Sequence, residues 1–65
     1  MTGRVSTFDE RRGLGEVQGD DGESYPFHCT RIADGSRSIP RGVAVTFEVA
    51  PGGLGRWEAV AISRV

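Results

Sequence analysis

Val43-Ala44-Val45-Thr46-Phe47-Glu48-Val49 is the stretch that decides the fold class of this chain. Within it, Val45, Phe47 and Val49 alternate with small or polar residues. A period of two is typical of a β-strand with one buried face, because successive side chains of a strand point to opposite sides of the sheet. We therefore expect a half-buried strand over residues 43–49.

Shorter β-rich runs accompany this stretch, at residues 3–8, 14–18, 24–28 and 56–65. Turns rich in glycine and proline separate them, which is typical of an all-β meander. Gly15 interrupts the second run, where a glycine marks a bulge, a sharp coil or a close backbone approach. Pro26 cannot donate to a sheet ladder, so we expect its strand to lie at an edge or to be locally unpaired.

The remaining segments are less regular. Residues 29–32 are expected to form one helical turn, and the polar residues 33–42 a long loop. Both faces of the last run are partly apolar, so alternation does not assign its inward face. Five strands with a longer third connection suit a small Greek-key barrel, in which closure removes exposed sheet edges.

Composition limits the chain to one small domain over residues 1–65. A domain of this size buries only about 60% of its unfolded surface, so its core has few side chains. The single cysteine, Cys29, excludes an internal disulfide and a cysteine-rich zinc site within one chain. No signal peptide is visible, and the apolar runs are far shorter than the ~20 residues that span a bilayer. We expect a cytoplasmic protein without membrane contact.

The charge balance disfavours strong electrostatic binding to nucleic acid. The net charge is −1, from eight basic residues, all arginine, and nine acids. Non-specific affinity for nucleic acid depends on many phosphate contacts by basic side chains, and a basic excess is absent here. A local basic patch remains open, with candidates for phosphate or partner contact at Arg12, Arg31, Arg37, Arg41 and Arg56. Each of them alone is more often a solvated surface charge.

No catalytic set is recognisable, so we do not expect an enzyme, a cofactor or a metal. The paired acids Asp20-Asp21 lie in an expected turn, and no nucleophile, base and orienting group occur together. His28 ends an expected strand and Cys29 follows it directly, and neighbouring residues of a strand point to opposite faces, which is unsuited to chelation.

The ordered series of segments resembles the bacterial cold-shock proteins. Gly3–Asp9 parallels their G-x-V-K-W-F-N, and Arg12–Val17 parallels K-G-F-G-F-I. Ser24–His28 parallels D-V-F-V-H, and Arg41–Val49 parallels E-G-x-x-V-x-F-E-V. The resemblance implies a five-stranded antiparallel OB-fold β-barrel, the cold-shock domain, acting as a bacterial, monomeric protein that binds single-stranded RNA or DNA.

The departures from the family lie where its members stack bases on aromatic side chains. Those positions hold Thr7, Leu14, Glu16, Pro26 and Cys29. Arg12 keeps a positive charge of the second-strand motif, and His28 keeps its family identity. A stacked base contributes roughly 1–3 kcal/mol, so losing about four platforms lowers affinity on the order of a thousandfold or more.

The resemblance and the residue types together give a candidate nucleic-acid-binding set. It comprises Ser6, Phe8, Arg12, Leu14, His28, Arg56 and Trp57. Packing is the competing interpretation for Phe8, and it is favoured for Trp57 because tryptophan is usually largely buried. His28 has the competing interpretation of an ordinary surface histidine.

A second function also fits the departures. A barrel that has lost nucleic-acid binding would act as a protein-interaction module. Its contact patch would then be formed by the replaced residues Leu14, Pro26 and Cys29.

Overall fold

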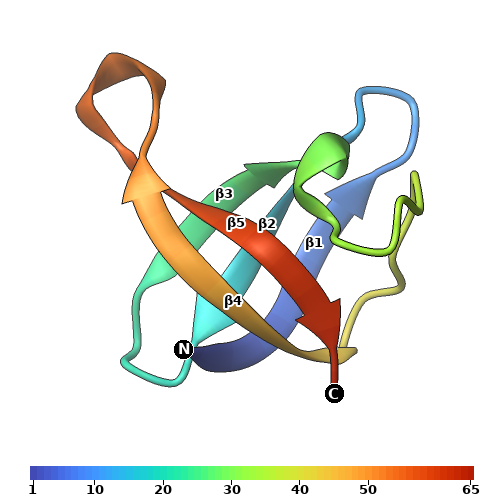
Figure 1. The fold of residues 1–65 in the computed structure, drawn as a ribbon, viewed down its shortest axis with the longest axis horizontal. Helices are drawn as coiled ribbons and strands as arrows, with labels where there is room; N and C mark the ends of the chain where they lie inside the picture. Colours follow the sequence, from blue (N-terminus) through green and yellow to red (C-terminus); the bar gives the residue numbers. More distant parts are fainter.

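The structure, a computed structural model, describes residues 1–65 with the exception of the side chain of Leu54. Five strands make up most of the chain (Figure 1). They are β1 (Thr2–Asp9), β2 (Leu14–Gly19), β3 (Ser24–His28), β4 (Ala44–Pro51) and β5 (Trp57–Arg64). Two single turns of 3-10 helix, η1 (Cys29–Arg31) and η2 (Gly53–Gly55), complete the regular structure. Among the described residues there is no helix long and apolar enough to cross a membrane.

All five strands belong to one antiparallel sheet with the order β3-β2-β1-β4-β5. Strands β1, β2 and β3 follow one another as hairpins, whereas the chain after β3 crosses over to place β4 on the other side of β1. The sheet is strongly bent, so that β4 and β5 run across the other three strands (Figure 1). The all-β, five-stranded antiparallel prediction is confirmed.

The two edge strands of the sheet, β3 and β5, approach each other across the bend. They share no strand ladder. Just after η1, Ile32 and Ile62 form a single parallel bridge, and the amide of Ala33 donates to the carbonyl of Ile62 at 2.8 Å. This contact brings the end of β5 close to the end of β3.

The core lies inside the bent sheet and is wholly apolar. Its buried members are Val5, Val17, Phe27, Ile32, Ile39, Val45, Phe47, Ala59 and Ile62. The alternation expected over residues 43–49 is confirmed, because Val45 and Phe47 are buried and Val49 packs against the core. Ile39 is a core residue that was not predicted, because it lies in the irregular segment before β4, where no periodicity marks a buried side chain.

Strand β5 has an irregular face for a physical reason. Its buried residues Ala59 and Ile62 are three apart, because the register with β4 shifts between Thr46 and Glu48. Ala61 has a positive φ of 51° within this shift. An extra residue in one strand reverses the inward and outward positions beyond it, which is why alternation could not assign this strand.

Pro26 lies in edge strand β3, as expected, and Gly15 marks a close approach. A β-carbon at Gly15 would lie 2.6 Å from the carbonyl oxygen of Thr7, 2.8 Å from the Phe27 ring and 2.9 Å from the Phe8 ring. The two rings are stacked, with centroids 5.9 Å apart. Only glycine, which has no side chain, allows the backbone of β2 to pass this close to the two rings.

Replacing Gly15 by alanine is therefore expected to destabilise the fold. The cost of such overpacking is about 1–3 kcal/mol in the free energy of unfolding, measured by chemical denaturation. Gly53→Ala is the matched control, since a β-carbon there meets nothing within 4 Å, and a change within about 0.5 kcal/mol is expected. Equal stability of Gly15→Ala and the parent would show that the approach is not tight.

The β2–β3 turn is stabilised by a hydrogen bond between two side chains. The Tyr25 hydroxyl donates to Oδ2 of Asp21 at 2.5 Å, and Oδ1 of Asp21 accepts from the amide of Glu23 at 3.0 Å. The Tyr25 bond is the main reason that the pKa of Asp21 lies below 3.8. The same bond raises the pKa of Tyr25 to about 12.

Tyr25→Phe keeps the ring against Phe47 and removes only this hydrogen bond, so the pKa of Asp21 should rise towards 3.8. A carboxylate with a lowered pKa in the folded state stabilises the fold above its unfolded pKa, and this contribution disappears as pH falls through the folded value. The melting temperatures of parent and variant should thus differ most near neutral pH and converge in acid. A difference in melting temperature that stays constant with pH would contradict this account. The pKa of Asp21 itself is followed by NMR titration. Asp34 is the internal control in that titration, because its pKa is lowered mainly by Ser36.

Candidate nucleic-acid interface

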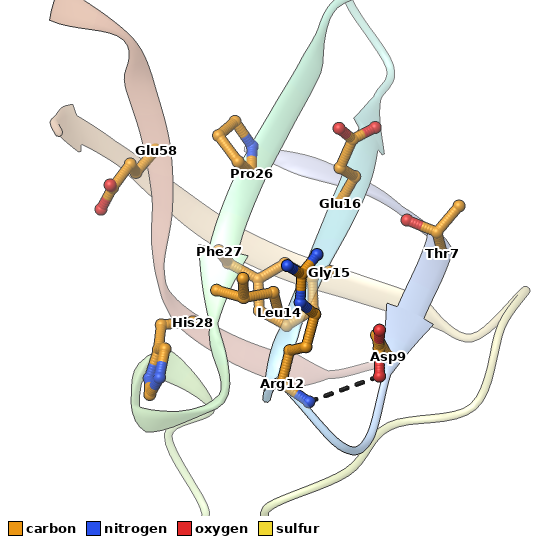
Figure 2. Close-up of a pocket in the computed structure, with 10 residues that line it drawn as sticks. All are labelled: Thr7, Asp9, Arg12, Leu14, Gly15, Glu16, Pro26, Phe27, His28 and Glu58. Atoms are coloured by element: carbon orange, nitrogen blue, oxygen red, sulfur yellow. Dashed lines mark hydrogen bonds between the residues drawn. The ribbon is translucent and has the colours of Figure 1, made fainter. Parts of the chain in front are cut away.

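The outer face of β1, β2 and β3 carries a groove of about 510 Å³, here named the β1–β3 groove (Figure 2). Its lining residues are Thr7, Asp9, Arg12, Leu14, Gly15, Glu16, Pro26, Phe27, His28 and Glu58. Nine of the ten come from β1 to β3 or the turn between β1 and β2. The groove is therefore a property of the three-stranded half of the sheet.

Strand register arranges the outward side chains of this groove in two rows. The rows are Thr7, Glu16 and Pro26, and next to them Asp9, Leu14 and His28. Directly opposed residues on neighbouring strands have β-carbons about 4.5–5.5 Å apart, so each row is a continuous strip of surface. The family resemblance assigns five positions to base stacking. Four of them lie in these rows, namely Thr7, Leu14, Glu16 and Pro26. The fifth, Cys29, does not line the groove.

The floor of the groove is formed by Gly15 and the ring of Phe27. Phe8 stacks on Phe27 at an interplanar angle of 16° and is half-buried against the core. It does not line the groove, so its position fits the packing interpretation. The two rings support the groove from below.

Leu14 and Pro26 supply the apolar part of the surface. Leu14 is 46% exposed at the start of the middle strand, and Pro26 is half-buried on the edge strand. Both side chains project from the sheet in Figure 2. They offer apolar area to a flat ligand, without the π-face of the aromatic residues that they replace.

His28 is oriented by a local cap. Its Nδ1 accepts the amide hydrogen of Thr30 at 3.2 Å and lies 3.0 Å from the Thr30 hydroxyl, at the start of η1. When Nδ1 accepts, the neutral imidazole carries its proton on Nε2. The cap thus fixes the tautomer and holds an exposed ring beside Leu14.

The electrostatic character of the groove is acidic. Asp9, Glu16 and Glu58 give three negative charges against one positive charge from Arg12, so carboxylates outnumber guanidinium groups in the groove. Asp9 caps the β1–β2 turn by accepting the backbone amides of Arg11 and Arg12 at 3.0 and 3.3 Å. A phosphate entering this groove meets one guanidinium and several carboxylates, which weakens its attraction.

Of the remaining candidate residues, Ser6 lies beside the groove and two others lie apart from it. Ser6 sits at the register shift of β1, and its hydroxyl donates to the backbone carbonyl of Glu16 at 3.2 Å.

Arg56 and Trp57 lie at the β4–β5 end and do not line the groove. Trp57 is 59% exposed opposite Pro51, so the favoured prediction that it packs in the core is wrong. A position at the first residue of a strand, next to a glycine-rich turn, explains its exposure.

Two acidic residues of the groove, Asp9 and Glu58, were not predicted. Asp9 is paired with Leu14 across the β1–β2 ladder, which places it at the groove. Glu58 arrives from β5 because the bend of the sheet brings that strand near β3. No local signal in the sequence marks this long-range approach.

Cys29 faces a second hollow of about 410 Å³, lined also by Ile32, Ser36 and Arg37. It therefore does not share the β1–β3 groove with Leu14 and Pro26, the other members of the expected apolar patch. Among the residues that the structure describes, no three His, Cys, Asp or Glu side chains are placed to hold a metal ion.

Comparison with known proteins gives several relatives, although no family model matches the chain. Cold shock-like protein CspC of Bacillus cereus is 34% identical over 56 residues, which cover 85% of this chain and 86% of that protein. Cold shock protein CspD of Bacillus subtilis is 33% identical over 56 residues, covering 85% of both.

A plant protein also matches. Glycine-rich protein 2 of Nicotiana sylvestris is 40% identical over 63 residues, covering 94% of this chain and 29% of that protein. The chain thus spans less than a third of this plant relative and most of the length of the bacterial ones. On this similarity over nearly its whole length, the chain belongs to the cold shock protein family.

Proposed function

We propose that this protein binds single-stranded nucleic acid, RNA or DNA, weakly and through the β1–β3 groove. The observation that carries the proposal is the placement of Arg12, Leu14 and His28 together on the outer face of the three-stranded half of the sheet. Membership of the cold shock protein family supports the same ligand class. Single-stranded nucleic acid is bound by a surface that combines base contacts with positive charge along the backbone.

The proposed binding is weak for two reasons, the lack of aromatic stacking partners at Leu14 and Pro26 and the acidic charge of the groove. Leu14 and Pro26 give a base apolar contact area but no aromatic stacking partner. The surplus of carboxylates reduces the phosphate attraction that Arg12 supplies. Both effects lower affinity without removing the surface.

Within this proposal the candidate residues have different roles. Arg12 contacts phosphate, and Leu14 and His28 contact bases. Ser6 supports the groove through its hydrogen bond to the Glu16 carbonyl, and Phe8 does so by stacking on Phe27. Arg56 and Trp57 extend the surface towards the β4–β5 turn, where an exposed indole offers a stacking face.

The architecture and setting belong to the same proposal. The approach of β3 to β5 supports a sheet that closes on itself as an OB-fold barrel of the cold-shock type. We further propose a monomeric, cytoplasmic, non-enzymatic protein. Loss of nucleic-acid binding in favour of a protein partner is the competing function, and the binding experiment below separates the two.

Fluorescence anisotropy with a labelled single-stranded oligonucleotide tests the proposal. Affinity should fall as salt rises, and Arg12→Gln should weaken binding and reduce the slope of log K against log salt by about 0.7, the value for one phosphate contact on a single strand. Arg64→Gln is the matched control, because it removes the same charge from an exposed site outside the groove. The proposal fails if no oligonucleotide binds at low salt, or if Arg12→Gln and Arg64→Gln have equal effects.

A further inference from the structure

We propose that Glu16 makes the β1–β3 groove select bases by their hydrogen-bond donors, favouring guanine and disfavouring uracil and thymine. This inference rests on the proposed function, since it assigns the ligand preference of the same groove.

Glu16 is held in place by the strand ladder on both sides. It lies on the middle strand of the three, paired with Thr7 on β1 and with Pro26 on β3. Its carbonyl oxygen accepts the Ser6 hydroxyl at 3.2 Å, and the residue is half-buried. The side chain rises from a backbone tied to both neighbours, with its carboxylate at the groove surface (Figure 2).

Apolar surface for a base lies next to this carboxylate. Leu14 is two residues away on the same face of β2, a separation of about 7 Å along a strand, and Pro26 is the cross-strand neighbour of Glu16. A base that covers Leu14 and Pro26 therefore presents its polar edge to Glu16. Because the backbone of Glu16 is held by both neighbouring strands, its side chain approaches this edge from a defined point of the sheet.

The chemistry of the carboxylate decides which edges fit. An ionised carboxylate has two oxygens that only accept hydrogen bonds. Guanine presents two adjacent donors, N1–H and the 2-amino group, which match the two oxygens. Cytosine and adenine present one amino donor beside an acceptor nitrogen, whereas uracil and thymine present one N–H between two carbonyl oxygens that repel the carboxylate. Charge-assisted bonds to the fitting edge are short and strong.

The other two acids of the groove are placed differently. Asp9 accepts two backbone amides of the β1–β2 turn through its Oδ1. Glu58 reaches the groove from β5 and lies against Gly52, where a β-carbon would collide with it. Glu16 is the acid next to both apolar contact residues.

A set of three DNA heptamers tests the inference by anisotropy: all-thymine, and the same sequence with a central guanine or a central hypoxanthine. Hypoxanthine keeps N1–H and lacks the 2-amino group, so it isolates one of the two bonds. The guanine heptamer should bind at least about fivefold more tightly than all-thymine, the lower limit for a bidentate base contact, with hypoxanthine between them. Glu16→Gln should remove most of this preference, while Glu48→Gln, which removes an exposed charge on β4 outside the groove, should keep it.

Two results would overturn the inference. The first leaves the proposed function standing, and the second overturns it as well. Equal binding of all three heptamers, or a guanine preference that Glu16→Gln leaves intact, would remove the role of Glu16 and leave nucleic-acid binding standing. Absence of binding by every heptamer at low salt would overturn the proposed function and this inference together.

Discussion

Strand β1 is shared between two halves of the sheet, and the rest of the structure depends on how it divides its pairing. It pairs with β4 only over Thr2–Arg4 and with β2 along nearly its whole length. The register shift between Val5 and Thr7 lies where β1 leaves β4. At the other end of this short ladder, β4 continues past the start of β1 and pairs with β5 alone over Glu48–Pro51, and the sheet bends between its two halves (Figure 1). The bend encloses the core and leaves the outer face of the three-stranded half accessible.

The β1–β3 groove follows from this division and from the alternation of side chains along β2 and β3. Val17 and Phe27 point inward and are buried, and they agree with the family pattern. Glu16 and Pro26 point outward from the same strands and depart from it. Inward residues are constrained by packing against the rest of the core, whereas outward residues are constrained only by what they bind. The inward residues of these strands therefore match the family resemblance, and the outward ones depart from it.

Local patterns in the sequence were sufficient for much of the fold. The alternation over residues 43–49 gave the strand and its buried face, and Pro26 correctly indicated an edge strand. The features that were missed depend on contacts distant in sequence. Ile39 is buried although no periodic pattern surrounds it, and the irregular register of β5 is created against β4. The position of Trp57 was wrong because residue type alone gives only an average burial.

The candidate site could be predicted only in part, because some of its residues come together through contacts distant in sequence. Leu14 and His28 were placed correctly on one surface because the strand order of β1 to β3 follows the chain, and the register pairs them directly. Glu58 could not be placed, since it depends on the approach of β5 to β3. Its carboxylate matters to the account, because it contributes to the acidic charge of the groove.

The central claim is that substitutions on one intact face, rather than a loss of the face, limit the affinity for nucleic acid. The most direct test is to restore one aromatic platform with Leu14→Phe at an exposed position on β2, and to compare it with Thr46→Phe, an exposed position on β4 outside the groove. Leu14→Phe should tighten binding to a single-stranded oligonucleotide by about five- to a hundredfold, as one stacked base contributes, with Thr46→Phe unchanged. If both variants bind like the parent, the β1–β3 groove is not the surface that contacts nucleic acid.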